Sequence, residues 1–329
     1  MKPTAHLFFR KPVSGHYSIE VLYQSLLPVF EKNFDVKWTE NIRPTKGIFF
    51  RLMDAIDASF RQGQINHITG DVHYLTYFMR RKRTVLTIHD FVGLETSNGL
   101  KRWLLWLLWY WLPSKRVAAI VVISRSTEAQ LHQYLRIEPK LVHLIPNPVN
   151  PDFKPRDRTF DSSSPRILQV GTGQNKNLER HAQALADLKC CLVILGQPSK
   201  DQIALLKRMQ INFEIHSSLK TAAVVELYQG CDLLLFGSTY EGFGMPIIEA
   251  QASGIPVITS NLWSMPEVAG EGALLVDPFN LQSLRNAISD IIGNSNLRSD
   301  LIEKGFENVR RFKVENIAER YVHVYRSLL

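Results

Sequence analysis

The sequence predicts an α/β protein with two domains, each a doubly wound parallel sheet. Three observations support this fold class. The chain has 329 residues, about twice the length of an ordinary domain. Short apolar, β-branched runs alternate with amphipathic helical patterns along the whole chain. The runs are apolar on both faces, which is typical of parallel strands buried between two layers of helices.

The individual elements follow from the same patterns. Strands are expected at residues 5–9, 34–38, 65–68, 84–88, 117–123, 141–145, 166–170, 191–195, 212–216, 232–236, 256–259 and 273–276. Helices are expected at residues 18–30, 47–61, 177–188, 200–209, 221–229, 246–253, 280–292 and from 297 to the end. This number of strands is larger than one small sheet usually contains, which again indicates two domains.

A proline-rich segment separates the two halves. Residues 146–155 contain four prolines and no regular period, which is typical of a linker. We therefore expect an N-terminal domain at 1–155 and a C-terminal domain at 156–329, with a final helix that could pack back on the first domain. Ligands of such folds bind at the carboxyl ends of the strands, so a site is expected in a cleft between the domains.

The composition excludes several classes of protein. With 45% hydrophobic and 21% charged residues, the chain is neither disordered nor fibrous. No apolar window is long enough to span a bilayer, and the N-terminal apolar run is too short for a signal peptide. Cys190, Cys191 and Cys231 form neither a disulfide framework nor a zinc motif. We expect buried thiols in a reducing, cytoplasmic location.

The excess positive charge lies in the N-terminal half. Residues 1–155 contain 21 basic and 12 acidic residues, whereas residues 156–329 contain 18 and 19. This asymmetry indicates either an anionic partner or a solvated basic face. No helix-turn-helix, RRM or OB pattern accompanies the charge, so an anionic membrane surface is expected as a partner and nucleic acid is not.

An aromatic segment in the same half supports a membrane partner. Residues 103–112 are ten consecutive apolar residues, about three helical turns or roughly 15 Å, which is too short to cross a bilayer. The residues expected at a membrane or acceptor contact are Trp103, Trp106, Trp109, Lys101 and Arg102. Aromatic rings between basic pairs suit a bilayer interface. A helix buried in the core is the alternative, and the sequence leaves both open.

The strongest chemical signal follows the apolar run at 233–236. Residues 237–250 read G-S-T-Y-E-G-F-G-M-P-I-I-E-A. Glycines allow close backbone approach, proline suits a first helical turn, and a helix N-terminus attracts anions. The carboxylates of Glu241 and Glu249 could accept hydrogen bonds from sugar hydroxyls. The pattern predicts a phosphate and polyol site, and the alternative is a glycine-rich turn without a ligand.

These residues carry a resemblance to a known family. The spacing of Glu241 and Glu249 resembles the E-x7-E signature of the family 4 retaining glycosyltransferases, which have the GT-B fold. The similarity extends over about residues 140–295 and is weaker before them, where T-I-H-D at 87–90 fits. The resemblance implies two Rossmann-like domains facing each other across a cleft. It also implies sugar transfer from a nucleoside-diphosphate sugar with retention of the anomeric configuration.

The resemblance also implies roles for single residues. Glu241 and His89 would act at the reacting sugar. The residues that would bind the diphosphate and sugar of the donor are Gly15, Lys176, Gly242, Phe243, Gly244 and Glu249, the last of these at the ribose. Val170 and Gly171 would lie near the base. The family's phosphate-binding Arg is not matched, because Thr172 stands in its place, and Pro148 follows Asn147 where the family has Gly.

The absence of a D-x-D motif indicates that no chelated metal is required, and no other cofactor is expected. The predicted function is sugar transfer to a hydroxyl of a membrane-associated glycan or lipid-linked acceptor, in the synthesis of cell-surface polysaccharide or lipopolysaccharide. The enzyme would be cytoplasmic and peripheral on the inner face of the cytoplasmic membrane. Two alternatives remain, namely a soluble acceptor and a non-catalytic binding subunit of the same fold.

Overall fold

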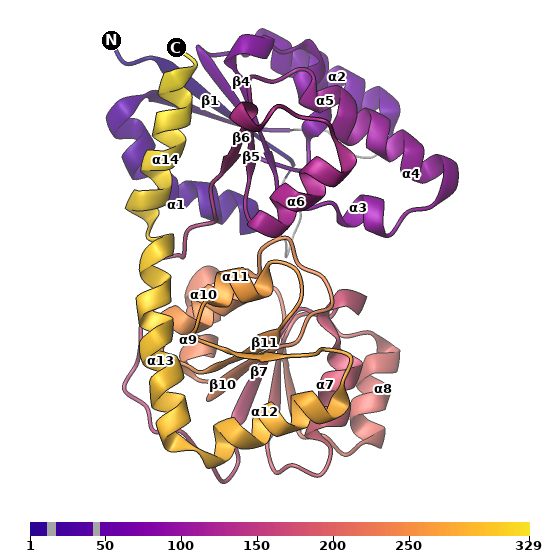
Figure 1. The fold of residues 1–329 in the computed structure, drawn as a ribbon, viewed down its shortest axis with the longest axis vertical. Coiled ribbons are helices and arrows are strands. Elements are labelled where there is room, and N and C mark those ends of the chain that lie inside the picture. The colour runs from indigo at the N-terminus through magenta and orange to yellow at the C-terminus, as the bar shows by residue number, and fades with distance from the viewer. Residues whose placement is uncertain (12–17, 42–46) are drawn as a thin grey trace. The chain divides into compact units, whose positions relative to one another are not determined.

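The computed structural model describes residues 1–11, 18–41 and 47–329. The chain forms two compact units, which are described separately (Figure 1). Unit 1 comprises Met1–Pro148 and Val314–Leu329, and unit 2 comprises Val149–Lys313. Each unit has a six-stranded sheet in which all the paired strands are parallel, with helices on both faces. The predicted fold class is therefore confirmed.

Unit 1 has the sheet order β2-β1-β3-β4-β5-β6. Its strands are β1 (Thr4–Phe9), β2 (Asp35–Glu40), β3 (Ile65–Ile68), β4 (Thr84–Ile88), β5 (Ala119–Val122) and β6 (Val142–Leu144). Its helices are α1 (Ser18–Asn33), α2 (Ile48–Phe60), α3 (Val92–Glu95), α4 (Gly99–Leu105), α5 (Leu112–Ser114), α6 (Arg125–Tyr134) and α14 (Val314–Ser327). Shorter helical turns are η1 (His73–Phe78), η2 (Arg81–Arg83) and η4 (Pro139–Leu141).

Unit 2 has the sheet order β12-β11-β10-β7-β8-β9. Its strands are β7 (Arg166–Val170), β8 (Cys191–Leu195), β9 (Phe213–His216), β10 (Leu233–Phe236), β11 (Val257–Ser260) and β12 (Leu274–Val276). Its helices are α7 (Leu178–Leu185), α8 (Lys200–Arg208), α9 (Thr221–Gln229), α10 (Met245–Ala252), α11 (Met265–Ala269), α12 (Leu281–Gly293) and α13 (Ser295–Val309). Two 3-10 turns, η5 (Gln174–Lys176) and η6 (Arg310–Phe312), complete the unit.

All twelve predicted strands are present, and their bounds differ from the prediction by at most two residues. Strands β4 and β10 are buried at every position, because helices cover both faces of each sheet. The three cysteines are free and buried, as predicted. Burial raises the pKa of the Cys190 thiol to about 11 and that of Cys231 to about 12, so both thiols stay protonated.

The first boundary between the units lies at Pro148, seven residues before the one expected from the prolines. The segment that follows is attached to unit 2. The Val149 N–H donates to the Phe312 carbonyl at 2.9 Å, and the Phe153 ring packs edge-on against Tyr228 with centroids 5.1 Å apart. These contacts attach the proline-rich segment to the unit that follows it.

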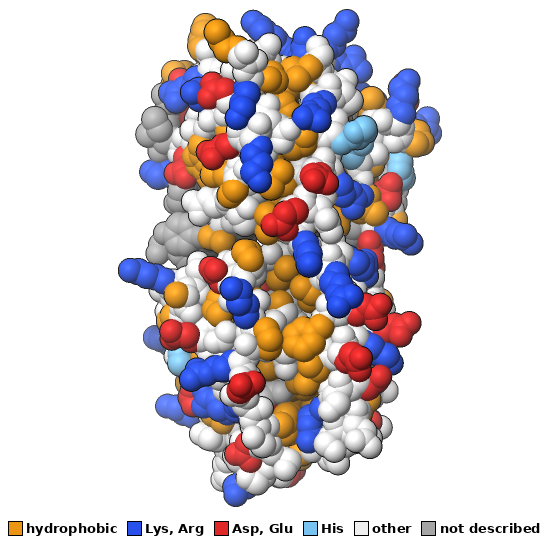
Figure 2. All heavy atoms as spheres, turned by 90° about the vertical axis from the view of Figure 1, so that its left-hand side faces the viewer, with side chains coloured by type: hydrophobic (Ala, Val, Ile, Leu, Met, Phe, Trp, Pro, Cys, Tyr) orange, Lys and Arg blue, Asp and Glu red, His pale blue; other side chains and the backbone are white. Residues whose placement is uncertain are grey.

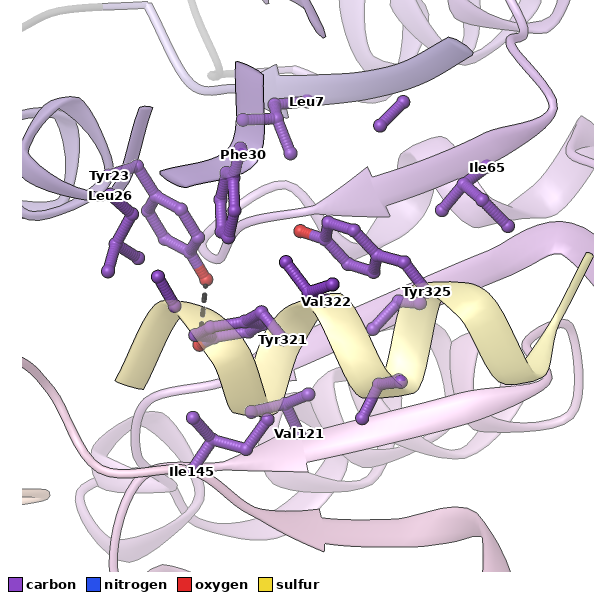
Figure 3. Close-up of a cluster of buried hydrophobic side chains, with 14 of the residues drawn as sticks. Leu7, Tyr23, Leu26, Phe30, Ile65, Val121, Ile145, Tyr321, Val322 and Tyr325 are labelled. Carbon is purple, nitrogen blue, oxygen red and sulfur yellow. Dashed lines mark hydrogen bonds between the residues drawn. The ribbon is translucent and has the colours of Figure 1, made fainter. Parts of the chain in front are cut away.

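The chain returns to unit 1 through α14. Figure 3 shows Tyr321 and Tyr325 pointing from α14 toward Tyr23 and Phe30 of α1. The Tyr321 and Tyr23 hydroxyls are 3.1 Å apart, and the ring centroids of Phe30 and Tyr325 are 5.5 Å apart. These side chains belong to one buried cluster with strands β1, β3, β4 and β5. Helix α14 is thus part of the hydrophobic core of unit 1.

The aromatic segment at 103–112 is neither wholly buried nor wholly exposed. It runs through α4 into η3 (Trp106–Trp111), which has the hydrogen bonds of a π-helix. Tyr110 is buried, whereas Trp103 is 52% exposed. One side of the segment therefore packs on the core while the other side is open to solvent. No helix among the described residues is long and apolar enough to cross a bilayer.

Candidate functional site

The order of the sheet in unit 2 places two loops at its switch point. Strands β7 and β10 are neighbours, and the chain winds outward from them in opposite directions. Parallel sheets bind ligands in the crevice at this point, beside the carboxyl ends of the two strands. The loop after β7 carries Lys176, and the loop after β10 carries Glu241. The Lys176 Nζ lies 2.5 Å from the Glu241 Oε1, so the structure brings these two predicted residues together.

The two loops are also joined by one backbone hydrogen bond and two that side-chain amides donate. The Thr239 N–H donates to the Asn175 carbonyl at 2.8 Å, and the Asn175 amide donates to the Tyr240 carbonyl at 3.0 Å. The Asn177 amide donates to the Gly237 carbonyl at 3.0 Å. Asn177 has a left-handed backbone (φ 60°), which Asn adopts more readily than most residues. The position of Lys176 relative to Glu241 therefore depends on several bonds in addition to the ion pair.

Gly171 allows the Lys176 side chain to cross its own loop. Gly171 has φ +83°, and a Cβ atom there would lie 3.0 Å from the Lys176 Cγ and Cε atoms. A larger residue would therefore displace the lysine stem. The Lys176 Nζ lies 4.8 Å from the centroid of the Phe236 ring at the end of β10. The ammonium group thus has an aromatic face as well as a carboxylate beside it.

A buried amide holds both ends of the Lys176 loop. The Gln169 side chain in β7 donates to the carbonyls of Gly171 and Lys176, each at 3.0 Å. Its Oε1 lies 2.5 Å from the Nδ1 of His181, and because an amide oxygen only accepts, that nitrogen donates. Burial lowers the pKa of His181 to about 3, so the imidazole is neutral. Sequence patterns missed this pair, although a glutamine inside an apolar strand was a visible signal.

Glu249 lies within α10, one of the helices beside the switch point. The Tyr228 hydroxyl donates to its Oε2 at 2.7 Å. Burial raises the pKa of the Glu249 carboxyl to about 7, although the tyrosine bond favours the charged form. The sequence did not reveal Tyr228 as a partner, because it comes from a different helix, α9.

The glycine-rich turn before α10 has two different faces. Phe243 is buried and packs edge-on against Phe312 with centroids 5.7 Å apart. The Ser264 hydroxyl lies within hydrogen-bond distance of the carbonyls of Glu241 and Phe243, at 3.0 and 2.8 Å. Gly244 has φ +104°, which a side chain would strain. Phe243 therefore anchors the turn from beneath, and Gly242 is partly exposed beside Glu241.

The residues at the start of the β7 loop are only partly buried. Val170 ends β7, and Gly171 follows it at the switch point. Thr172, at the position where the resemblance implies an arginine, donates its hydroxyl to the Gln197 carbonyl at 2.8 Å. That hydroxyl therefore links the loop to the segment after β8. The cationic group of this loop is that of Lys176.

In unit 1, His89 follows β4 at the carboxyl edge of the sheet. Its Nε2 lies 2.7 Å from the carbonyl of Thr69, which follows β3. A carbonyl only accepts, so Nε2 carries the proton of this hydrogen bond. Gly70 permits this contact, because a Cβ atom there would lie 2.5 Å from the His89 ring. Gly15, the other residue predicted for this edge, lies outside the described residues.

A charged cluster at the same edge was not predicted. Arg10 directly follows β1, and its guanidinium lies 3.3 Å from the Glu20 carboxylate and 2.8 Å from that of Asp71. Glu20 is buried at the start of α1. In this sheet the order reverses between β1 and β3. Arg10 and Asp71 follow these two strands, so the cluster lies at the switch point of unit 1.

Two family models match the chain. The model described as Glycosyltransferase Family 4 matches residues 33–153, and the model described as Glycosyl transferases group 1 matches residues 151–308. The second match contains Lys176, Glu241 and Glu249.

Curated relatives include enzymes of O-antigen synthesis. An O-antigen chain mannosyltransferase B from Escherichia coli is 32% identical over 102 residues, which are 31% of this chain and 27% of that protein. The matched segment thus spans about a quarter of that relative. An O-antigen chain mannosyltransferase RfbU from Salmonella typhimurium is 24% identical over 295 residues, which are 85% of this chain and 79% of that protein.

Solved structures share the fold of the whole chain. The sucrose-phosphate synthase of Thermosynechococcus elongatus superposes with a TM-score of 0.80 and 17% identity. The superposition covers 100% of this chain and 99% of that one. At this level of identity the likeness concerns the architecture of the two units.

Proposed function

Because the chain belongs to the group 1 glycosyltransferases of family 4 and has their GT-B fold, we propose that it transfers a sugar from a nucleoside-diphosphate sugar. The acceptor would be a hydroxyl of a glycan or lipid-linked molecule at a membrane, in the synthesis of cell-surface polysaccharide or lipopolysaccharide. The pairing of Lys176 with Glu241 at the switch point of unit 2 is the observation that carries this proposal. The two O-antigen mannosyltransferases among the relatives support the same setting.

The donor diphosphate needs positive charge, and the β7 and β10 loops supply it. The Lys176 ammonium group lies between β7 and the N-terminus of α7, and α10 begins at Met245 beside Glu241. A helix N-terminus carries a partial positive charge and attracts phosphate. When a diphosphate binds, Lys176 would contact it and stabilise the charge that develops on the leaving group. These groups need no metal, so we propose a reaction that is independent of divalent cations and persists in a chelator.

The two glutamates would hold the two sugars of the donor. Glu241 lies next to the Lys176 ammonium, so its carboxylate would accept hydrogen bonds from the transferred sugar. Glu249 would accept bonds from the ribose hydroxyls, with Tyr228 orienting its carboxylate. The acceptor hydroxyl would attack the anomeric carbon on the face that the diphosphate leaves. The bond between the anomeric carbon and the phosphate oxygen breaks, and the hydroxyl proton passes to the leaving phosphate. Because attack and departure occur on the same face, the configuration is retained.

His89 would act on the side of unit 1. Its protonated Nε2 is bound to the Thr69 carbonyl, so the ring has a fixed orientation and Nδ1 is the nitrogen that can accept a hydrogen bond. We propose that it contacts the transferred sugar or the acceptor hydroxyl, in line with the family resemblance of the T-I-H-D segment.

A thermal-shift panel with UDP, GDP, ADP and dTDP tests the donor site. A nucleotide at about 100 times its Kd stabilises the protein by about 2.7 kcal/mol, which is a shift of several degrees. We expect one nucleotide to stabilise the wild type and to lose most of this effect in Lys176→Ala. Lys207→Ala, at an exposed position on α8, is the matched control and should keep the full shift.

Two results would contradict the proposal. If no nucleotide shifts the wild type, the fold serves as a non-catalytic binding subunit. If the nucleotide shift is the same in Lys176→Ala as in the wild type, the diphosphate binds elsewhere. NMR of the product anomer tests retention separately, since an inverted product excludes the same-face attack.

A further inference from the structure

Helix α2 of unit 1 has its hydrophobic side facing outward. The residues that face the core are Asp54, Ala55 and Ala58, of which two are small and one is charged. Ile48, Phe49 and Phe60 are 80%, 66% and 84% exposed. An amphipathic surface helix normally buries its large apolar residues and exposes its small and polar ones. In α2 the arrangement is reversed.

The exposed residues form a continuous stripe. The exposed apolar residues of α2 are Ile48, Phe49, Phe50, Leu52, Met53, Ile56 and Phe60. Most are related by steps of four residues, and such residues lie one above another on the same side of a helix. A helix of 13 residues is about 20 Å long, so the stripe is a long apolar surface. A contiguous exposed surface of this kind marks a contact with a membrane or another molecule.

A second exposed apolar surface lies on an element that packs on the same η1 as α2. Helix α2 and the π-helix η3 both contact η1. The Arg51 guanidinium of α2 lies 4.9 Å from the centroid of the Trp109 ring. Beyond Trp109, the residues Leu100, Trp103, Leu104, Leu108 and Trp111 are exposed. A pocket of about 250 Å³ beside them is lined by Leu94, Gly99, Arg102, Trp103, Trp106 and Tyr134.

Basic side chains lie beside the two apolar surfaces. The Arg80 N–H donates to the Gln62 side chain at 2.7 Å, which brings the basic cluster at 80–82 to the C-terminal end of α2. Arg80, Arg81 and Lys82 are exposed, as are Lys101, Lys115 and Arg116 around the tryptophan surface. On α2 itself, the exposed Asp57 pairs with Arg61 at 3.0 Å. Glu138 is an exposed acidic residue close to Arg81 and Lys115. Basic and acidic side chains are also interspersed on the face that Figure 2 shows.

We propose that α2 lies in the interface of an anionic bilayer, with its apolar stripe inserted and the basic residues at 80–82 on the lipid headgroups. Exposed Phe, Ile and Leu on one side of a helix, with cations nearby, are the features of interfacial helices. A second copy of the chain is a poorer occupant. A symmetric dimer would bring the same basic cluster of each copy to one interface, where the charges repel. Anionic lipid complements the apolar stripe and the positive charge together.

This inference names the membrane contact of the proposed enzyme and rests on the proposed function for its biological role. Binding to lipid is measured without donor or acceptor, so the two proposals can fail independently. The full chain is sedimented with vesicles of phosphatidylcholine, or of equal parts phosphatidylcholine and phosphatidylglycerol. The test variant is Phe49→Ser/Phe60→Ser. Phe279→Ser in unit 2 is the matched control, because Phe279 is 57% exposed and far from α2 in the sequence.

We expect the wild type to bind the anionic vesicles and the double variant to bind them at least about tenfold more weakly. In the variant, two aromatic rings no longer move from water into the bilayer. Phe279→Ser should bind like the wild type. Arg81→Glu/Lys82→Glu should weaken binding to anionic vesicles, and added salt should have the same effect on the wild type. The double serine variant should keep the nucleotide-induced thermal shift, which shows that it is folded.

Three results would overturn the inference. The first is a wild type that stays in the supernatant with anionic vesicles. The second is a double serine variant that sediments as the wild type does. The third is a wild-type dimer that the double variant abolishes while neither protein binds lipid, which would assign the stripe to a second copy.

Discussion

Glu249 has a carboxyl group that changes its charge near neutral pH. Its pKa is raised to about 7 because the group is removed from water, and the Tyr228 hydroxyl opposes this by stabilising the charged form. In the proposed function only the charged form accepts hydrogen bonds from both ribose hydroxyls. We therefore expect the affinity for the nucleotide to increase as the pH rises from 6 to 8.

Tyr228→Phe tests this assignment. The substitution removes the hydrogen bond that favours the carboxylate, so the pKa of Glu249 should rise further and the binding profile should move to higher pH. Glu249→Gln should give weak binding that no longer changes over this range. Calorimetric titrations of the nucleotide at several pH values measure both effects. A Glu249→Gln profile like that of the wild type would show that another group titrates.

At the scale of an element, the loop after β7 depends on one side chain within the strand. Gln169 donates to the carbonyls at both ends of the loop and accepts a bond from His181. Gln169→Leu would leave these buried polar groups without this partner, and each such group typically costs about 1–3 kcal/mol. Lys176 would then be held less firmly beside Glu241, so we expect kcat to fall by about tenfold or more.

Gln169→Glu separates positioning from simple loss of stability. A glutamate still accepts from His181 but cannot donate to the two carbonyls, so it should restore part of the stability while kcat stays low. The nucleotide KM, the kcat and the thermal midpoint are measured for both variants. If kcat and the thermal midpoint recover together in Gln169→Glu relative to Gln169→Leu, then Gln169 has a structural role only.

The strands and the loops differ in how far the sequence reveals them. Strands such as β4 and β10 were predictable because continuous apolar runs are required wherever helices cover both faces of a sheet. The ion pair of Lys176 and Glu241 was not predictable in this way. The two residues are 65 positions apart, and their loops meet only because β7 and β10 are neighbours in the sheet. A motif identified each residue, and the sheet order brought them into contact.

Helix α2 shows a different limit of sequence patterns. The helix was predicted at 47–61 and is observed at Ile48–Phe60. Its periodicity indicates an apolar side, and such a side is normally assigned to the core. The small residues Ala55 and Ala58 occupy that position, because η1 lies close against the helix. Which side of a helix is covered depends on the neighbouring elements, and these are far from it in the sequence.

At the scale of the whole molecule, the two ends of the chain complete one unit. His67 of β3 lies at the centre of this arrangement, with its Nδ1 2.6 Å from the Tyr325 hydroxyl of α14 and its Nε2 2.7 Å from the Thr87 hydroxyl. Burial lowers the pKa of His67 to about 3. The contact of α14 with the sheet of unit 1 therefore includes an uncharged imidazole that cannot accept a proton near neutral pH.

This burial makes the stability of unit 1 depend on pH. Below pH 6.5 the unfolded chain binds a proton at His67, whereas the folded chain binds none until about pH 3, so acid favours unfolding. As the pH falls from 7 to 5, we expect His67 to lower the free energy of unfolding by about 2 kcal/mol. Over the same pH interval, the free energy of unfolding of His67→Gln should fall by less than that of the wild type, and the difference should equal this contribution. Five of the six tryptophans lie in unit 1, so urea unfolding followed by tryptophan emission reports mainly on it. Equal losses in the two proteins would refute the assignment.

The division into units also preserves the charge asymmetry seen in the sequence. Unit 1, with α14 included, contains 22 basic and 13 acidic residues, whereas unit 2 contains 17 and 18. The positive charge therefore belongs to the unit that carries α2 and the tryptophan surface. The positive charge and the exposed apolar residues of α2 lie on the same unit, as the proposed contact with a membrane requires.

The return of the chain through α14 determines the order in which the protein can form on the ribosome. Multidomain proteins generally fold from the N-terminal domain onward during synthesis. Here unit 2 is continuous, from Val149 to Lys313, and its sequence is complete before Val314–Leu329 are translated. Until then, the core of unit 1 lacks Tyr321 and Tyr325, and the part of the cluster that α14 covers, between α1 and the sheet, stays exposed. The nascent chain therefore completes its second unit first, and ribosomes that stall before codon 314 release a first unit that is open to aggregation and proteolysis.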